Sequence, residues 1–379
     1  MADHEQMRDA VEAGRVRVGI LCLRGTTKPL DASPYYMRRE LDRSLGETTL
    51  IGDIHRYPLL KKLTGRGLGR VSPNACAQRA LKALKRKPQD LLVGLYASRL
   101  IAELPPTSAP LVYFTDGAAH DIVDLYPQFS RLSPQGREAM IRSEEITAAR
   151  SDLIIVHSAW AAQAFVEKVG VEAEKVHVLP IGSNSGLTSP GLEPSVIEPD
   201  SPIELIFIGR DWERKGLPMS VKVVDELNDR GVLAHLSAFG CDPPASVLSE
   251  NVTCYGPFDR ARPAEARCVE EAIIRAHVNI LPSISECYGV GAGEVAALYT
   301  PSLVTNVQGL PECVLDGVTG AVLSSDAEPG DFADVIMSWA HSPETYRKLC
   351  LGAEHDARTR LNWASWGQAV RDLVRAKLF

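Results

Sequence analysis

Short apolar runs alternate with longer segments of helical periodicity along the first half of the chain. Runs rich in Val, Ile and Leu predict six strands, at residues 16–23, 48–54, 90–96, 110–116, 152–158 and 175–182. Most of these runs are apolar at nearly every position, which is typical of strands buried on both faces of a parallel sheet. Helical patterns, such as those at 34–45 and 158–170, lie between them. This βαβ rhythm predicts an α/β fold with an open, doubly wound sheet.

The same rhythm restarts after a segment rich in Ser, Pro and Gly. Six further strands are predicted, at 203–210, 233–240, 252–256, 278–283, 301–306 and 320–325, and two helical stretches, roughly 330–354 and 363–378, follow. The predicted parts are a Rossmann-like domain over 1–184 (with 1–14 mobile), a linker at 185–202, a second Rossmann-like domain over 203–362 and a last helix over 363–379. Ligands of such sheets bind at the carboxyl ends of the strands, so the strand-to-helix turns should carry the chemistry.

Bulk composition narrows the class of protein. The 379 residues carry a net charge of −7, which disfavours a dedicated nucleic-acid binder. The eight cysteines form no C-x-x-C pair, so free thiols explain them better than disulfides or zinc. The charged start of the chain does not resemble a secretory signal, and no apolar run reaches the roughly 18 residues of a membrane-spanning helix. We therefore expect a cytoplasmic protein.

The turn after the predicted strand at 203–210 reads GRDWERKG. It begins with Gly209 and Arg210 and ends with Lys215. Two cations at a strand end suit a diphosphate, because Arg can bind two oxygens at once and Lys acts as a point charge. A solvated basic turn is the alternative. The chain has no P-loop, and its first strand does not run into G-x-G-x-x-G, so a P-loop NTPase and a simple dehydrogenase are disfavoured.

The turn after the strand at 278–283 reads SECYGVGAGE and contains two carboxylates, Glu286 and Glu294. Gly289 lets a ligand approach the backbone, and N–H groups at a helix start bind anions. The other candidate donor-binding residues of this run are Cys287, Tyr288 and Val290. An ionised carboxylate only accepts hydrogen bonds, so Glu286 suits sugar hydroxyls and Glu294 a ribose diol. The two turns together predict a nucleotide-diphospho-sugar as ligand.

A third turn, after the strand at 301–306, contains Gly309 and Glu312 and would close the wall of the same pocket, although an ordinary connection explains it equally well. Taken together, the three turns resemble retaining GT-B glycosyltransferases of family 4, the glycosyl transferases of group 1. The family's G-R-x-x-x-x-K-G element is matched at 209–216, its Glu-x7-Glu element at 286–294, and its G-x-x-E…G-x-x-G run at 309–320. The three occur in the family's order.

The resemblance implies a GT-B fold, in which two Rossmann-like domains face a cleft and the last helix crosses back onto the first domain. It implies that the second domain binds the donor, that Arg210 and Lys215 stabilise the leaving diphosphate, and that the anomeric configuration is retained. It also implies no metal and no cofactor besides the nucleotide-sugar co-substrate. Two residues depart from the family pattern: Gln308 replaces the first glycine of a Gly-Gly pair, and Cys287 stands where glycine is frequent.

The first half is then expected to bind an acceptor hydroxyl, on a glycan or a lipid-linked molecule. Asp116, where family members often have a histidine, is the best candidate to position or deprotonate that hydroxyl, with His120 as the rival and helix capping as the alternative. Ser33 and Tyr35 open a predicted helix and resemble the small-Pro-Tyr-Tyr run of some family members. The tyrosines there could stack on sugar or pack in the core.

Lys and Arg concentrate in the region 61–87. This region suits docking on anionic lipid, where each cation contributes about 1 kcal/mol, and a solvated helix face is the alternative.

The pattern as a whole favours a glycosyltransferase of polysaccharide or glycoconjugate synthesis. A GT-B sugar-nucleotide epimerase and a catalytically silent nucleotide-sugar-binding protein are the alternatives.

Overall fold

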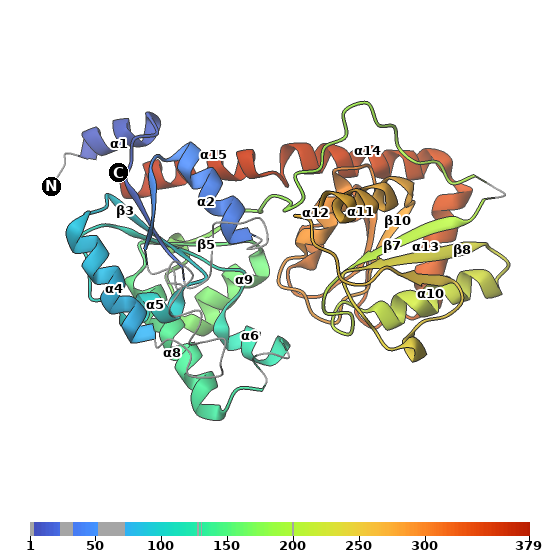
Figure 1. Ribbon diagram of the computed structural model, residues 1–379, viewed down its shortest axis with the longest axis horizontal. Helices are drawn as coiled ribbons and strands as arrows, with labels where there is room; N and C mark the ends of the chain where they lie inside the picture. Colours follow the sequence, from blue (N-terminus) through green and yellow to red (C-terminus); the bar gives the residue numbers. More distant parts are fainter. Residues whose placement is uncertain (1–3, 23–32, 52–72, 127–128, 130, 199–200) are drawn as a thin grey trace. The chain divides into compact units, whose positions relative to one another are not determined.

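The computed structural model describes residues 4–22, 33–51, 73–126, 129, 131–198 and 201–379. The chain divides into two compact units (Figure 1). The first comprises Met1–Pro180 with Trp363–Phe379, and the second comprises Ile181–Asn362. Each unit contains one parallel sheet of six strands. The predicted α/β fold is therefore confirmed.

The strands of the first unit are arranged in the order β2-β1-β3-β4-β5-β6. Their bounds are β1 Val18–Leu21, β2 Thr48–Ile51, β3 Leu91–Leu95, β4 Leu111–Phe114, β5 Leu153–Val156 and β6 Val176–Val178. Every residue of β1, β3, β4 and β5 is buried. Helices cover both faces of the sheet, and this explains why these strands are apolar at each position rather than at alternate ones.

The helices of the first unit are α1 His4–Glu12, α2 Ser33–Ser44, α4 Pro73–Arg86, α5 Ser98–Glu103, α6 Ala119–Leu125, α8 Pro134–Arg150, α9 Ala159–Ala164 and α15 Trp363–Leu378. Figure 1 shows α1, α2 and α15 along one face of the sheet and α4, α5 and α8 along the other. Aromatic side chains attach α15: the Trp363 and Tyr36 rings stack with centroids 5.7 Å apart, and the Trp366 ring lies 5.4 Å from that of Phe114.

The segment 1–14, for which mobility is predicted, contains the helix α1. Val11 is completely buried, and Glu12 Oε1 lies 2.6 Å from Arg375 Nη1 of α15. The short charged sequence gave no sign of this packing, because the surface that α1 covers comes from the other end of the chain.

The second unit has the strand order β12-β11-β10-β7-β8-β9. Its strands are β7 Ile203–Ile208, β8 Ala234–Phe239, β9 Val252–Cys254, β10 Val278–Leu281, β11 Ser302–Thr305 and β12 Gly320–Leu323. The chain order reverses between β7 and β10, which pair in parallel at the centre of the sheet. The turns that follow these two strands therefore meet at a switch point, the usual ligand site of such sheets.

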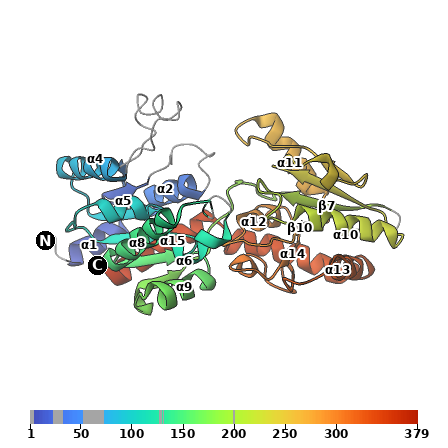
Figure 2. The same cartoon turned by 90° about the horizontal axis from the view of Figure 1, so that it is seen from below.

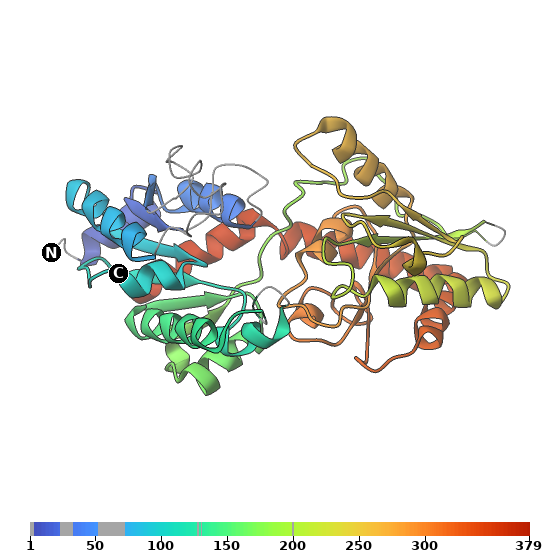
Figure 3. The same ribbon diagram turned by 60° about the horizontal axis from the view of Figure 1, so that its bottom comes forward.

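The helices of the second unit are α10 Leu217–Asp229, α11 Pro263–Arg275, α12 Val290–Ala296, α13 Pro329–His341 and α14 Pro343–Thr359. Figures 2 and 3 show α11 on one face of the sheet and α10 with α13 on the other. The single helix predicted at 330–354 is in fact two, α13 and α14. Pro343 lacks a backbone N–H and cannot continue a helix, but it fits the first position of α14.

Among the described residues, each strand lies within a predicted strand. The predicted strands are longer, mostly at their carboxyl ends. Ser158 caps helix α9, because its side chain accepts a hydrogen bond from the Ala161 N–H at 3.2 Å.

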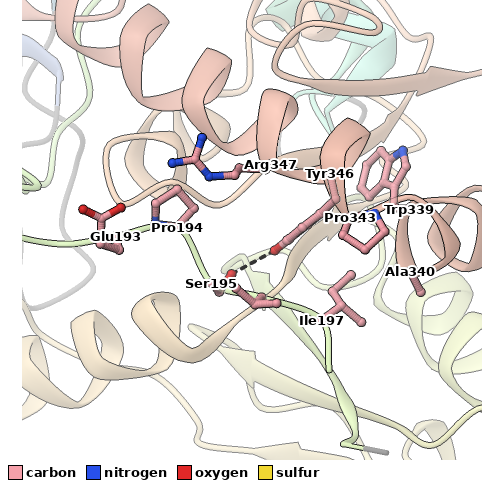
Figure 4. Close-up of a pocket in the computed structure, with 10 residues that line it drawn as sticks. Glu193, Pro194, Ser195, Ile197, Trp339, Ala340, Pro343, Tyr346 and Arg347 are labelled. Carbon is pink, nitrogen blue, oxygen red and sulfur yellow. Dashed lines mark hydrogen bonds between the residues drawn. The ribbon is translucent and has the colours of Figure 1, made fainter. Parts of the chain in front are cut away.

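The segment predicted as a linker, 185–202, lies within the second unit. Ser195 Oγ is 2.8 Å from Tyr346 Oη, as Figure 4 shows, and His277 Nε2 is 3.0 Å from the carbonyl oxygen of Val196. The segment and the α13–α14 corner enclose a cavity of about 260 Å³, into which Trp339 projects. Tyr346 Oη also donates to the His277 carbonyl, just before β10, so this cavity lies at the amino edge of the sheet.

Candidate active site

Two glycines shape the turn after β7. Gly209 is buried and continues the hydrogen-bonded ladder between β7 and β8. Gly216 precedes α10 with a φ of +81°, and a Cβ there would overlap the carbonyl oxygen of Pro282. The turn thus packs directly against the segment that leaves β10. Between the glycines, Arg210 is exposed and Lys215 is half-buried.

Glu286 follows β10 and lies buried between two cations of the β7 turn. Its Oε2 atom is 2.6 Å from Lys215 Nζ and 3.3 Å from Arg214 Nη1. Burial by itself would raise the pKa of the Glu286 carboxyl, but the charges of Lys215 and then Arg214 outweigh it and lower that pKa below its usual value. Glu286 is therefore an ionised acceptor in an otherwise buried place. The structure brings together Lys215 and Glu286, as the sequence predicted for one ligand site.

Arg214 is a member of this network that sequence analysis did not single out. Its Nη1 atom also donates to the backbone carbonyl of Ser285, and its Nε donates to Asp211 Oδ2 at 3.1 Å. Arg214 thereby joins the two turns and holds the segment before Glu286. The basic character of this turn was visible in the sequence, since GRDWERKG contains three basic residues. Nothing in the sequence shows which of them faces the neighbouring turn.

Glu294 is buried on α12 and has a different set of partners. Arg260 Nη2 lies 2.5 Å from Glu294 Oε2, and the Arg260 guanidinium stands 5.4 Å from the centre of the Phe258 ring. Burial raises the pKa of the Glu294 carboxyl, while Arg260, Lys215, the Asn184 backbone N–H and Arg210 reduce that rise. The two carboxyls of the motif thus have pKa values shifted in opposite directions. No local pattern pointed to Arg260, which comes from the loop after β9.

The run from Cys287 to Val290 leads into α12. Cys287 and Tyr288 are buried, and Gly289, with a φ of +93°, precedes the helix that Val290 begins. Gly291 and Gly293 therefore lie inside α12. Of the three glycines in this motif, only Gly289 belongs to the turn itself.

The third predicted turn touches the second. The backbone N–H of Gly309 donates to the Glu286 carbonyl at 3.3 Å, and the side chain of Gln308 accepts from the Glu286 N–H at 3.0 Å. Glu312 is half-buried, and Arg360 donates to its backbone carbonyl at 2.8 Å. Gly309 is therefore placed beside Glu286, whereas the carbonyl of Glu312 is bound by Arg360, the residue that follows α14.

In the first unit, Asp116 follows β4 and is half-buried. It does not cap α6, whose N-cap is Ala118 without a side-chain bond. His120, in the first turn of α6, has its Nε2 atom 3.4 Å from Glu145 Oε1. Asp116 thus lies in the loop between β4 and α6, whereas His120, expected on the same loop, lies in the helix that follows it.

A buried carboxyl that sequence analysis missed, Glu144 of α8, holds this loop. It accepts hydrogen bonds from the backbone N–H of Ala119 and, at 3.2 Å, from Tyr113 Oη. Burial raises the pKa of Glu144 to about 8, and the charge of Asp116 adds to the rise. Glu144 therefore couples helix α8 to the loop that carries Asp116.

Ser33 and Tyr35 lie in the first turn of α2 and are half-buried. The Tyr35 ring meets that of Tyr36 edge to face at 5.1 Å, and Tyr36 stacks on Trp363, so core packing occupies Tyr36. Part of the basic region, at 61–72, lies outside the described residues. Its remaining cations are exposed on and just after α4: Arg79, Lys82, Lys85, Arg86 and Lys87.

The described residues contain no group of three or more His, Cys, Asp or Glu side chains arranged to hold a metal ion. Among them, no helix is both long and apolar enough to cross a bilayer. Metal independence and localisation stay predictions.

Solved glycosyltransferases share the fold of this chain. Sucrose-phosphate synthase from Thermosynechococcus elongatus matches with a TM-score of 0.68 at 17% identity, over 96% of this chain and 99% of that one. WaaG, a glycosyltransferase involved in lipopolysaccharide biosynthesis, has a TM-score of 0.66 at 15% identity, over 94% and 99%. Anabaena HepE in complex with UDP and glucose has a TM-score of 0.65 at 14% identity, over 95% and 100%. The fold is that of the GT-B glycosyltransferases.

Residues 202–341 match the family described as glycosyl transferases group 1. The D-inositol 3-phosphate glycosyltransferase of Nocardiopsis dassonvillei is 28% identical over 256 residues, which are 63% of this chain and 59% of that protein. That of Corynebacterium diphtheriae is 26% identical over 253 residues, 62% of this chain and 58% of that protein. The chain thus spans less than two thirds of the length of these relatives. The predicted resemblance to the family is confirmed.

Proposed function

We propose that this chain is a retaining, metal-independent glycosyltransferase that moves a sugar from a nucleotide-diphospho-sugar to an acceptor hydroxyl, in the assembly of a polysaccharide or glycoconjugate. The observation that carries the proposal is the contact of Lys215 and Arg214 with the buried Glu286 at the switch point of the second sheet. Cations and an ionised acceptor side by side suit a ligand that has phosphates next to hydroxyls. HepE, whose fold is the same, was solved with UDP and glucose.

Each group has a defined task in this proposal. Arg210, which is exposed, and Lys215 bind the diphosphate and stabilise the charge that grows on it as it leaves. They supply the positive charge that a divalent metal supplies in other transferases. Glu286 accepts hydrogen bonds from the sugar hydroxyls, and Glu294 accepts them from the ribose diol. Gly209, Gly289 and Gly309 allow the ligand to come close to the backbone.

Transfer breaks the bond between the anomeric carbon and the phosphate oxygen, and forms one between that carbon and the acceptor oxygen. The electron pair of the broken bond stays on the nucleoside diphosphate. The acceptor proton leaves as the new bond forms. Asp116 is our candidate to position or accept that proton, with His120, in the first turn of α6, as the rival. The relatives are named for transfer to D-inositol 3-phosphate, which is therefore an acceptor to test first.

The first experiment screens the protein against UDP-, GDP-, ADP- and dTDP-glucose by thermal shift in EDTA. A ligand at 100 times its dissociation constant should stabilise the folded state by about 2.7 kcal/mol. Selective stabilisation by one nucleotide sugar, with slow release of its nucleoside diphosphate, supports a metal-free donor site. If magnesium or manganese must be added before any of them binds, metal independence is wrong. If none binds under either condition, the donor site itself is wrong.

Variants then separate the roles. Arg210→Ala should weaken donor binding tenfold or more with little change in stability, because Arg210 is exposed. Asp116→Ala should leave donor binding intact but lower transfer, and full activity would remove Asp116 from the site. Arg137→Ala, which removes a pair with Asp124 on the exposed surface of the first unit, is the matched control for loss of an arginine. NMR of the product decides whether the anomeric configuration is retained.

We also propose peripheral contact with anionic membranes through α4. The cations at its end are exposed, and of them Lys87 pairs with Glu47 at 2.6 Å. Co-sedimentation with vesicles that contain phosphatidylserine, but not with neutral vesicles, is the expected result. Equal co-sedimentation of the protein with both kinds of vesicle would mean that α4 is a solvated helix with no preference for anionic lipid.

A further inference from the structure

Gln308 has a backbone conformation that normally favours glycine. Its φ is +40°, in the left-handed region, where an L side chain is disfavoured. A residue that keeps such a conformation needs an interaction to compensate for it, and such positions concentrate at functional sites.

The side chain of Gln308 makes that interaction with Glu286. Gln308 Oε1 accepts a hydrogen bond from the backbone N–H of Glu286 at 3.0 Å. The next residue, Gly309, donates its own N–H to the carbonyl oxygen of Glu286 at 3.3 Å. Both peptide groups that flank the Glu286 Cα are therefore held by the turn after β11. A glycine at 308 would hold only one of them.

Two further features show that the attachment is directional. A backbone N–H can only donate, so the amide oxygen of Gln308 must face Glu286 and its NH₂ group must face away. Three residues earlier, Thr305 Oγ1 donates to the Ser283 carbonyl at 2.6 Å. The segment from Ser283 to Glu286 is thus pinned at both ends by one turn of the neighbouring strand.

We propose that Gln308 is a positioning residue that sets the direction of the Glu286 carboxylate toward the donor sugar. That carboxylate already receives Lys215 Nζ at 2.6 Å and Arg214 Nη1 at 3.3 Å. A rotation of the preceding peptide would turn its remaining lone pairs away from the sugar, and small errors of placement at a reacting centre are costly in rate. The inference rests on the proposed donor-site role of Glu286.

The test compares Gln308→Gly with Gln308→Met in the full chain. Both lose the hydrogen bond to Glu286, but Gly relieves the backbone conformation whereas Met, which is similar in length, retains it. Met should therefore unfold about 2–4 °C below wild type, and Gly close to wild type. If Gln308 positions Glu286, turnover should nevertheless fall about tenfold in both variants, with KM changed less than twofold. The substrate is whichever sugar nucleotide of the glucose panel the wild type hydrolyses fastest.

If Gln308 has only a structural role, turnover should instead follow the stability of each variant, and Gln308→Gly should be as active as wild type. That result would overturn the proposal. Gln368→Met is the matched control, because it removes an exposed amide that bonds Asp372 at 2.9 Å in the first unit.

Hydrogen–deuterium exchange of the peptide 283–290, without ligand, tests the attachment separately from activity. Faster exchange in both variants, at unchanged exchange elsewhere in the second unit, is expected, and unchanged exchange in this peptide would contradict it. If the wild type turns over no nucleotide sugar, the proposed function fails, while the exchange experiment still decides whether Gln308 holds Glu286.

Discussion

The two units have the same kind of sheet but stabilise their strand-end turns differently. In the second unit, cations hold the turns together: Lys215 and Arg214 contact the buried carboxylate of Glu286. In the first unit, the turn after β4 is held by the buried carboxyl of Glu144, through hydrogen bonds from a backbone N–H and from the hydroxyl of Tyr113.

The electrostatic consequence is a difference in protonation. The nearby cations lower the pKa of Glu286 despite its burial, whereas burial raises the pKa of Glu144 to about 8. Glu286 therefore stays ionised and accepts hydrogen bonds, while Glu144 carries a proton over much of the physiological range. Two sheets of the same type thus carry different carboxyls at their strand ends: the ionised Glu286 of the candidate ligand site in one unit, and the neutral Glu144 with a structural role in the other.

The largest expected effect is a loss of stability in the first unit that leaves the second unit unchanged. Trp366→Ala removes a buried ring that packs against Phe114, so it should destabilise the first unit by about 3–5 kcal/mol. Hydrogen exchange should rise throughout the first unit and stay unchanged in the second. Leu233→Ala, at a side chain that is 61% exposed in the second unit, should change stability by no more than about 0.5 kcal/mol. Equal exchange in both units after the Trp366 change would show that they unfold as one.

A pair of glycines with the same backbone conformation gives a smaller, matched contrast. Gly216 has a φ of +81° and Gly170, in the first unit, a φ of +79°. A Cβ at Gly170 meets nothing within 4 Å, so Gly170→Ala should cost only the conformational penalty, about 1–2 kcal/mol. Gly216→Ala also drives a methyl group into the Pro282 carbonyl and should cost clearly more. Urea unfolding measures both, and equal costs would mean that the β7 turn is free to adjust.

A third contrast concerns pH. The folded pKa of Glu144, about 8, lies above its usual 4.5, so the folded state binds this proton more tightly. Its contribution to stability is present below about pH 4.5 and is lost as pH rises toward 8, by up to about 1.4 kcal/mol per pH unit. The Glu144→Gln variant should not lose this stability as the pH rises.

The measurement is the difference in unfolding free energy between wild type and Glu144→Gln from pH 5 to 9. His157, whose burial lowers its pKa to about 4, acts in the opposite direction, because its contribution is lost as pH falls below about 6.5. It is present in both proteins, so the difference isolates Glu144. A difference that does not vary with pH would show that Glu144 is already ionised in the fold.

Much of the fold was predictable from local sequence, and part of the site was as well. All twelve strands fell within predicted runs, and Lys215 and Glu286, predicted to share one ligand, are in contact. The structure adds contacts that were not predicted where two segments distant in the sequence meet. Helix α1 pairs with α15 through Glu12 and Arg375, and the segment around Ser195 contacts Tyr346. Neither partner is near in sequence, so no local pattern could show these contacts.

The sequence by itself determined where the strands run and which turns carry glycine, cations and carboxylates, because those features depend on periodicity and on near neighbours in the chain. Only the tertiary structure decided the pairings: Arg214 with Glu286, Arg260 with Glu294, and the Gln308 side chain with a backbone N–H 22 residues away. These pairings depend on the order of strands in the sheet and on the direction of each side chain. Both are set only when the strands and helices of a unit pack together.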